Sequence, residues 1–238
     1  MVTPQSEGKS IPPRVGLVVF DLDGTLADTF EDIAQATNHV LKAFGCPTLP
    51  TETIKGYVGK GARNLLGQLL GPDKQPYVAD ATALWLDYYE RHPTDHTQLY
   101  PGAIELIEWL RAHGVRTAIL SNKMNSLTQR ISAELGLAAR VDFVRGESKQ
   151  WPRKPDPALL DHLIQHFGVK REEVLIVGDS VSDVELARNA GVAFCGVLTG
   201  QATREDLERL GATWVAENLV VLKSACEMFV VPPSGGRT

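Results

Sequence analysis

The sequence has 238 residues, enough for one domain with a large insertion or for two unequal domains with a full hydrophobic core. Its hydrophobic content of 43%, charged content of 22% and net charge of -5 exclude fibrous and disordered classes and disfavour nucleic acid and anionic membranes as partners. The three cysteines are widely separated and form no CxxC pair, a pattern typical of a protein of the reducing cytoplasm without a structural zinc.

The two ends of the chain are expected to lie outside the folded domains. Residues 1–14 contain prolines but no apolar signal segment, so they are predicted to form a flexible N-terminal arm. Residues 232–238 are predicted to form a disordered tail. The apolar segment 219–230 is interrupted by Lys223 and Glu227 and is shorter than the roughly 20 residues of a membrane span, so it predicts a closing helix.

An apolar segment, residues 15–20, runs directly into Asp21 and Asp23. Because it has no polar alternation, it predicts a strand covered on both faces, as in a parallel sheet. Ligands of open α/β sheets bind beyond the carboxyl ends of the strands, which makes these two acids the first candidates for a functional site. Two carboxylates this close repel each other unless a cation is supplied or one is protonated. The alternative is that they only end a strand and begin a turn.

Residues 30–97 change to a helical periodicity and are predicted to form an inserted all-α cap over the acids. Asp28, with Glu31 three residues later, is predicted to cap the first helix. The aromatic side chains Trp85 and Tyr89 are expected to pack inside the cap. The predicted helices are 33–44, 51–58, 62–70 and 76–91.

Residues 98–231 alternate apolar strands with helices, which predicts a doubly wound parallel sheet together with residues 15–29. The fold class is therefore α/β, with a Rossmann-like catalytic core and the helical cap between its first strand and the rest. The predicted strands are 116–120, 142–145, 174–178, 193–197 and 213–216, and the predicted helices are 103–113, 127–135, 157–167 and 183–190.

Three further segments place polar side chains beside the predicted strand ends. Ser121 and Asn122 follow the second strand and offer a hydroxyl and backbone N–H groups to a phosphate. Lys154 precedes a proline, which holds it in an extended backbone where its compact charge can neutralise acids and phosphate. Asp179 and Asp183 follow the fourth strand. Each feature alone is common in turns or on surfaces, but together they indicate one site.

These segments resemble the four motifs of the haloacid dehalogenase-like hydrolase superfamily. The matching residues are DLDGT from Asp21, then Ser121, Lys154, and GDSVSD with Asp179 and Asp183. The resemblance covers nearly all of residues 15–222, and the segments GYVGKGAR, YPGAIELIEWLRAHG and VGDSVSDVELARNAG look like those of phosphoglycolate phosphatases. It implies a parallel sheet of order 5-4-1-2-3 with the first strand central, and a cap of the four-helix type.

The same residues have the chemistry to hydrolyse a phosphomonoester through an aspartyl phosphate. Asp21 is predicted to attack phosphorus, and Asp23 to act first as acid and then as base. Mg²⁺ is the expected cofactor, held by the carboxylates of Asp21 and Asp179 and by the backbone carbonyl of Asp23.

Further residues are assigned to the phosphoryl group. Ser121, Lys154 and the N–H groups near Leu22 and Asn122 are predicted to stabilise charge on its oxygens. Asp183 is predicted not to bind the metal directly but to orient Lys154 or a metal-bound water.

The substrate is expected to be a small phosphorylated metabolite. Gly59, Lys60 and Gly61 precede a helix that begins near Ala62 and would form a small positive pocket, where Arg63 pairs with a carboxylate such as that of 2-phosphoglycolate. The alternative is that the glycines only shape a turn and the two cations are solvated. The expected assembly is a monomer or homodimer in the cytoplasm.

Several other functions are compatible with this core and cap. Pyrophosphatases, nucleotidases, sugar-phosphate phosphatases and phosphomutases of the same superfamily remain alternatives. A true dehalogenase lacks the second acid of the first motif, so Asp23 argues against it. A receiver-like signalling domain is the alternative without enzyme activity, because it also phosphorylates an aspartate beside Mg²⁺, but receivers have no inserted cap.

Overall fold

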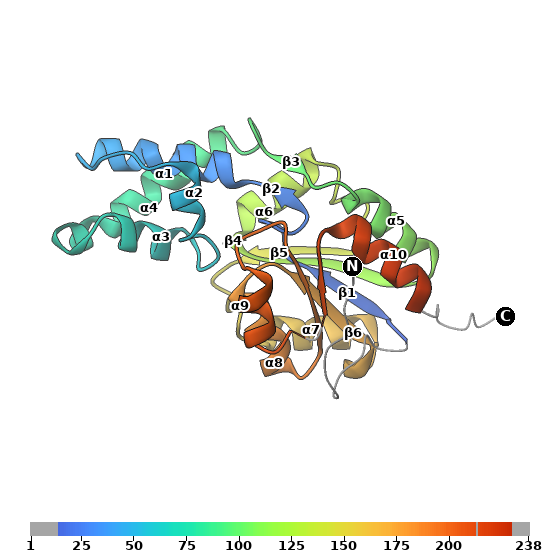
Figure 1. Ribbon diagram of the computed structural model, residues 1–238. Coiled ribbons are helices and arrows are strands. Elements are labelled where there is room, and N and C mark those ends of the chain that lie inside the picture. Colours follow the sequence, from blue (N-terminus) through green and yellow to red (C-terminus); the bar gives the residue numbers. More distant parts are fainter. Residues whose placement is uncertain (1–13, 213, 230–238) are drawn as a thin grey trace.

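The computed structural model describes residues 14–212 and 214–229. Its core is a six-stranded sheet of order β5-β4-β1-β6-β7-β8 with every neighbouring pair parallel (Figure 1). β1 lies between β4 and β6, so the predicted doubly wound sheet and its internal first strand are confirmed, with β8 added at one edge. The strands are β1 Leu17–Phe20, β4 Arg116–Met124, β5 Phe143–Glu147, β6 Val174–Gly178, β7 Ala193–Val197 and β8 Trp214–Ala216.

Helices cover both faces of this sheet because successive strand residues point to opposite sides. In β1, Val18 and Phe20 pack with α5, α6 and α10, whereas Leu17 and Val19 pack with α7, α8 and α9. Figure 1 shows α5 and α10 on one side and α7, α8 and α9 on the other. The helices are α5 Ala103–Ala112, α6 Asn125–Glu134, α7 Ala158–Phe167, the 3₁₀ turn Arg171–Glu173, α8 Val181–Ala190, α9 Arg204–Arg209 and α10 Leu219–Phe229.

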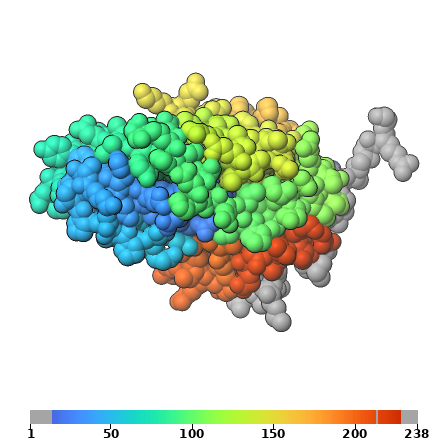
Figure 2. Space-filling view, turned by 90° about the horizontal axis from the view of Figure 1, so that it is seen from above, coloured from blue at the N-terminus to red at the C-terminus, as the bar shows by residue number. Residues whose placement is uncertain are grey.

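The predicted helical cap lies at one end of the core, as the blue-to-teal segment in Figure 2 shows. Its two connections to the core, β2 Ala27–Asp28 and β3 Gln98–Leu99, pair with each other as antiparallel strands. The last cap helix begins later than predicted because the residues before it form a 3₁₀ helix. The cap consists of α1 Phe30–Ala43, α2 Thr51–Lys55, α3 Ala62–Leu69, the 3₁₀ helix Pro72–Tyr77 and α4 Val78–Arg91.

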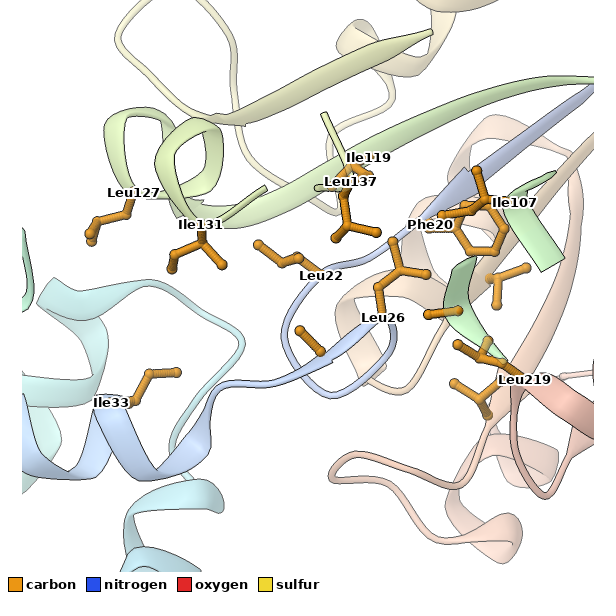
Figure 3. Packing of buried hydrophobic residues seen from close by; sticks show 14 of the residues in the cluster. Phe20, Leu22, Leu26, Ile33, Ile107, Ile119, Leu127, Ile131, Leu137 and Leu219 are labelled. Atoms are coloured by element: carbon orange, nitrogen blue, oxygen red, sulfur yellow. The ribbon is translucent and has the colours of Figure 1, made fainter. Parts of the chain in front are cut away.

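The turn after β1 is anchored in the hydrophobic core. Leu22 and Leu26 are fully buried and belong to the same cluster as Ile33 of the cap and Ile131 of the core. Figure 3 shows this cluster continuing from Ile33 through the turn to the core helices. The acids that flank Leu22 in the sequence are therefore attached to a turn that is packed into the core.

The prediction that Asp28 is the N-cap and forms a capping box with Glu31 is wrong, although Asp28 Oδ1 accepts a 3.3 Å hydrogen bond from the Phe30 N–H at the first position of the helix. α1 begins at Phe30 with Thr29 at its N-cap, and Asp28 belongs to β2, because the pairing of β2 with β3 extends the chain through Asp28. Thr29 makes no capping hydrogen bond with its side chain. Its hydroxyl instead donates to Asp23 Oδ1 at 2.6 Å.

The other differences concern element ends. β4 runs to Met124, beyond the predicted end at Leu120, and its register with β5 shifts between these two residues, so the second motif lies where regular pairing stops. Thr213 of the last predicted strand, residues 1–13 of the predicted arm and the predicted tail lie outside the described residues. Within the described residues, no helix combines the length and apolar character needed to cross a bilayer.

Candidate active site

Asp21, Asp179 and Asp183 come together at the carboxyl ends of β1 and β6. Each offers a carboxylate oxygen, these oxygens lie within 4.8 Å of one another, and all three residues are buried. β1 and β6 are adjacent parallel strands, so residues that follow them reach the same edge of the sheet. The three acids therefore lie together at the strand ends, as the sequence predicts.

Lys154 supplies a positive charge to this cluster. Its Nζ lies 3.0 Å from Asp21 Oδ1 and 2.7 Å from Asp183 Oδ1. The second oxygen of Asp183 accepts a 2.6 Å hydrogen bond from the Ser180 hydroxyl. Both oxygens of Asp183 are thus engaged by protein groups, and this carboxylate holds Lys154 against Asp21.

The cluster holds more negative charge than Lys154 balances. Burial raises the pKa of Asp21 well above its usual value, even though Lys154 acts in the opposite direction. Burial and the neighbouring Asp183 raise the pKa of Asp179 to about 7. Burial alone would lower the pKa of Lys154, but Asp183 and Asp21 raise it. Buried carboxylates with this excess of charge fit a hard divalent cation such as Mg²⁺, which prefers oxygen ligands.

Asp179 is held in a single position by its neighbours. Its Oδ1 accepts a 2.7 Å hydrogen bond from the Thr25 hydroxyl, and its Oδ2 accepts a 3.0 Å hydrogen bond from the Gln201 backbone N–H. A Cβ atom on Gly24 would lie 2.4 Å from Oδ2, and one on Gly200 would lie 1.7 Å from it. Two glycines therefore leave the space that this carboxylate occupies.

Asp23 stands apart from the three clustered acids and faces the cap. Its Oδ1 accepts a 2.6 Å hydrogen bond from the Thr29 hydroxyl and forms an ion pair with Lys123 Nζ at 3.1 Å. Within the described residues no hydrogen bond reaches Oδ2. One oxygen of Asp23 is therefore fixed by the protein, while the other is available to a bound molecule.

A cavity of about 40 Å³ joins these groups to the cap. Carboxylates and the second motif form its core side, and apolar side chains form much of its cap side. Its lining consists of Asp21, Asp23, Phe30, Ile33, Val58, Gly59, Gly61, Ala62, Leu65, Trp85, Ser121, Asn122, Lys123, Met124, Asp179, Ser180 and Gln201.

The model of the haloacid dehalogenase-like hydrolase family matches residues 18–197. The chain belongs to this family. Relatives named phosphoglycolate phosphatase include that of Nitrosospira multiformis, 37% identical over 77% of this chain and 84% of the relative, and that of Vibrio parahaemolyticus, 32% identical over 86% and 93%. The crystal structure of a predicted phosphoglycolate phosphatase from Haemophilus somnus is 27% identical, with a TM-score of 0.78 over 89% of this chain and 98% of that chain.

The predicted phosphate-binding groups of this hydrolase differ in their availability. Ser121 lines the cavity, and its Oγ accepts the Lys123 N–H at 3.1 Å, which leaves its hydroxyl proton for an anion. The Leu22 N–H donates to Asp21 Oδ1 at 2.7 Å. It is therefore occupied by the carboxylate of the first motif in this structure.

Asn122 makes structural contacts with its entire amide group. Its Nδ2 donates to the carbonyls of Gly59 at 2.9 Å and Lys154 at 3.1 Å, and its Oδ1 accepts the Lys154 N–H at 2.8 Å. The Asn122 side chain thus ties the cap loop to the backbone that carries Lys154. Asn122 also lines the cavity, and the predicted contact of its backbone N–H with a phosphoryl oxygen stays a prediction.

The structure does not bring Lys60 and Arg63 into the cavity. Both residues are exposed, and Arg63 borders a separate hollow on the cap together with Arg153. Gly59 and Gly61 do line the cavity, so the loop contributes its backbone to the wall while its cations face away. The alternative reading of this loop, a turn with solvated cations, describes the observed placement.

Lys123, Tyr89 and Trp85 are among the residues at the site that were not predicted as such. Lys123 lies between Asp23 and Tyr89, whose hydroxyl accepts a 3.0 Å hydrogen bond from Nζ. Trp85 lines the cavity, and its indole N–H donates to Thr37 Oγ1 at 3.1 Å. The only sequence signal for Lys123 is its position directly after the second motif at the end of a buried strand, since its partner Tyr89 belongs to the cap.

Proposed function

We propose that the protein is a Mg²⁺-dependent phosphomonoester hydrolase that acts through an aspartyl phosphate, with 2-phosphoglycolate as its substrate. The observation that carries the reaction is the convergence of Asp21, Asp179, Asp183 and Lys154, with Asp23 two residues from Asp21 and facing the same cavity. The names of the relatives support the substrate. We place the enzyme in the cytoplasm, where its three free cysteines would stay reduced.

The metal would be held by the carboxylates of Asp21 and Asp179 and by the backbone carbonyl of Asp23. Asp183 is assigned to Lys154 because the Lys154 ammonium lies 2.7 Å from its Oδ1, whereas the contacts of Asp179 come from the neutral groups of Thr25 and Gln201. When bound, the metal would neutralise charge on the phosphoryl oxygens and help to orient the ester.

The first half-reaction forms a bond between an oxygen of Asp21 and phosphorus while the bond from phosphorus to the ester oxygen breaks. Asp23 donates a proton through Oδ2 to the departing oxygen, because Thr29 and Lys123 hold Oδ1. Lys154 stays within 3.0 Å of Asp21 and offsets the charge of the entering phosphoryl group.

The second half-reaction hydrolyses the aspartyl phosphate. Asp23, now a carboxylate, takes a proton from water as the water oxygen attacks phosphorus, and the acyl phosphate bond breaks to return Asp21 as a carboxylate. The Ser121 hydroxyl, which lines the cavity, would donate to a phosphoryl oxygen in both steps. The proton given to the leaving group is thus recovered from water, and the cycle balances.

The cavity supports a small substrate. Its volume of about 40 Å³ corresponds to roughly three water molecules at about 10–15 Å³ for each water centre. Apolar cap side chains such as Phe30, Leu65 and Trp85 line it and would limit bulk water around the aspartyl phosphate. Even 2-phosphoglycolate is larger than three water molecules, and a nucleotide would require a still greater displacement of these cap side chains.

A panel of phosphate esters assayed with and without Mg²⁺ tests the proposal. We expect 2-phosphoglycolate to be preferred over sugar phosphates, nucleotides and pyrophosphate, and every turnover to require the metal. Asp21→Asn should abolish turnover, because the amide is a poor nucleophile of nearly the same shape. Full Mg²⁺-dependent activity in that variant would refute the aspartyl-phosphate route, and preference for a nucleotide or sugar phosphate would refute the substrate.

A further inference from the structure

Lys123 is a buried cation at the boundary between core and cap. Its side chain is 3% exposed, and its Nζ lies 3.1 Å from Asp23 Oδ1. On the cap side, Nζ lies 3.0 Å from the Tyr89 hydroxyl oxygen and 4.4 Å from the centre of the Tyr89 ring. A cation is attracted both to a phenol oxygen and to an aromatic face, so Tyr89 and Asp23 together fix the position of the ammonium group.

The cap holds Tyr89 firmly in this role. Tyr89 is fully buried on α4, and its ring packs edge-on against Trp85 with the ring centres 4.9 Å apart. The Trp85 indole N–H donates a hydrogen bond to the hydroxyl of Thr37 of α1, and this hydroxyl donates to the carbonyl of Ile33 at 2.8 Å. The position of Lys123 therefore depends on two cap helices as well as on β4.

Charge in the cavity makes Lys123 the natural partner of a second anionic group. Among the described residues, it is the only lysine or arginine that lines this cavity. Lys154 reaches the site from behind Asp21 and is committed to Asp21 and Asp183. An ammonium group has three N–H donors, and contacts to Asp23 and Tyr89 account for two of them. No other polar contact of Nζ occurs among residues 14–212 and 214–229, so the third remains for a ligand.

The position of Lys123 also fits the geometry of a phosphorylated 2-hydroxy acid. The ester oxygen of such a substrate must approach Asp23 Oδ2 to receive its proton. Its carboxylate is attached to the carbon that carries this oxygen, and this short span would let it reach Lys123, whose Nζ lies 3.1 Å from the other oxygen of Asp23. Lys60 and Arg63 have exposed side chains outside this cavity.

We propose that Lys123, held in place by Tyr89 of the cap, binds the carboxylate of the substrate and selects phosphorylated small acids over neutral phosphate esters. The inference rests on the proposed phosphatase function and assigns its specificity to a residue of the core strand β4. The cap contributes by fixing this lysine and by closing the cavity around it.

The test compares 2-phosphoglycolate with ethyl phosphate, which has the same two-carbon chain but no carboxylate. In the Lys123→Met variant, we expect the ratio of kcat/KM for the two esters to fall by about 10- to 100-fold, the loss typical of one hydrogen bond to a charged group. The fall should come mainly from a higher KM for 2-phosphoglycolate. Lys123→Arg should retain most of the preference, and the surface control Lys42→Met should retain all of it.

Tyr89→Phe is a second test that keeps both charges in place. It removes the hydroxyl that fixes Lys123, so we expect a higher KM for 2-phosphoglycolate and little change in KM for ethyl phosphate. A thermal unfolding curve shows whether Lys123→Met is folded. If it is not folded, Tyr89→Phe alone tests whether Lys123 binds the substrate carboxylate.

Three results would overturn the assignment. Equal losses for both esters in Lys123→Met would mean that the lysine acts only through Asp23. If the ratio of kcat/KM for the two esters is unchanged in both Lys123→Met and Tyr89→Phe, the substrate carboxylate binds elsewhere. If Lys60→Met abolishes the preference for 2-phosphoglycolate, the carboxylate binds at the cap loop. If the unmodified enzyme hydrolyses other phosphate esters but does not prefer 2-phosphoglycolate over ethyl phosphate, the proposed substrate fails independently of Lys123.

Discussion

Replacing Gly200 with alanine tests how closely the backbone surrounds the Asp179 carboxylate. A methyl group at this position would lie 1.7 Å from Asp179 Oδ2 and 2.1 Å from its Cγ, whereas ordinary contacts begin near 3.4 Å. The carboxylate must therefore move by roughly 1.5–2 Å, because the obstacle is a Cβ fixed to the backbone. That movement would disrupt the contacts from Thr25 and Gln201, which now hold its two oxygens.

We expect Gly200→Ala to lower the reaction rate strongly and the free energy of unfolding moderately. A displacement of about 1 Å at a reacting centre costs about 10²-fold in rate, equivalent to about 2.7 kcal/mol of transition-state stabilisation. Overpacking of this kind typically costs about 1–3 kcal/mol of unfolding free energy. Steady-state assays over a range of Mg²⁺ concentrations should show at least this loss in kcat and a higher Mg²⁺ requirement.

Gly67→Ala is the matched control. Gly67 lies within α3, and the nearest side-chain atom to an added Cβ is 3.9 Å away. Alanine should therefore leave kcat unchanged and stabilise the helix by up to about 1 kcal/mol. Full activity of Gly200→Ala with an unaltered Mg²⁺ requirement would refute the idea that Asp179 must hold this position.

Three further predictions concern the acids and one histidine. Asp183→Asn removes the charge that holds Lys154 and should lower kcat by about 10- to 100-fold with little change in KM, and an unchanged kcat would remove Asp183 from the mechanism. Mg²⁺ at about 100 times its Kd should stabilise the protein by about 2.7 kcal/mol, observed as a higher Tm that Asp179→Asn abolishes, whereas an equal shift in that variant would place the ion elsewhere. A hydrogen bond with Asp32 raises the pKa of His96 above its ordinary 6.5. Protonated His96 therefore stabilises the folded protein; this contribution is complete below pH 6.5 and is lost as the pH rises through the pKa of His96 in the folded state. The Tm of the unmodified protein should therefore fall over this pH range more than the Tm of His96→Gln. Identical profiles of Tm against pH for the two proteins would contradict this prediction.

The parallel arrangement of the sheet explains why most of the site could be predicted. Asp21, Ser121 and Asp179 each follow an apolar strand, and neighbouring parallel strands end at the same edge whatever the details of packing. Lys154 was predicted from its extended backbone before a proline and from the need to balance the acids, and the structure places it between Asp21 and Asp183.

The remaining features depend on contacts between distant segments, for which the sequence carries little local signal. Thr29 and not Asp28 is the N-cap of α1, because the pairing of β2 with β3 decides where the chain becomes helical. Lys60 lies between Gly59 and Gly61, and Arg63 is the second residue of α3, but only the folded loop determines that both side chains are exposed and do not line the cavity. Gly200 is an unremarkable loop residue until Asp179 is packed against it.

The most direct test of the account is the detection of a phosphate group covalently attached to Asp21 during turnover. Enzyme mixed with Mg²⁺ and 2-phosphoglycolate should be quenched in acid within a single turnover and digested, and its peptides analysed by mass spectrometry. The account predicts one added phosphoryl group on the peptide that contains Asp21, sensitive to hydroxylamine and absent from Asp21→Asn. A phosphoryl group on another residue, or rapid turnover with no phosphorylated enzyme at any quench time, would contradict it.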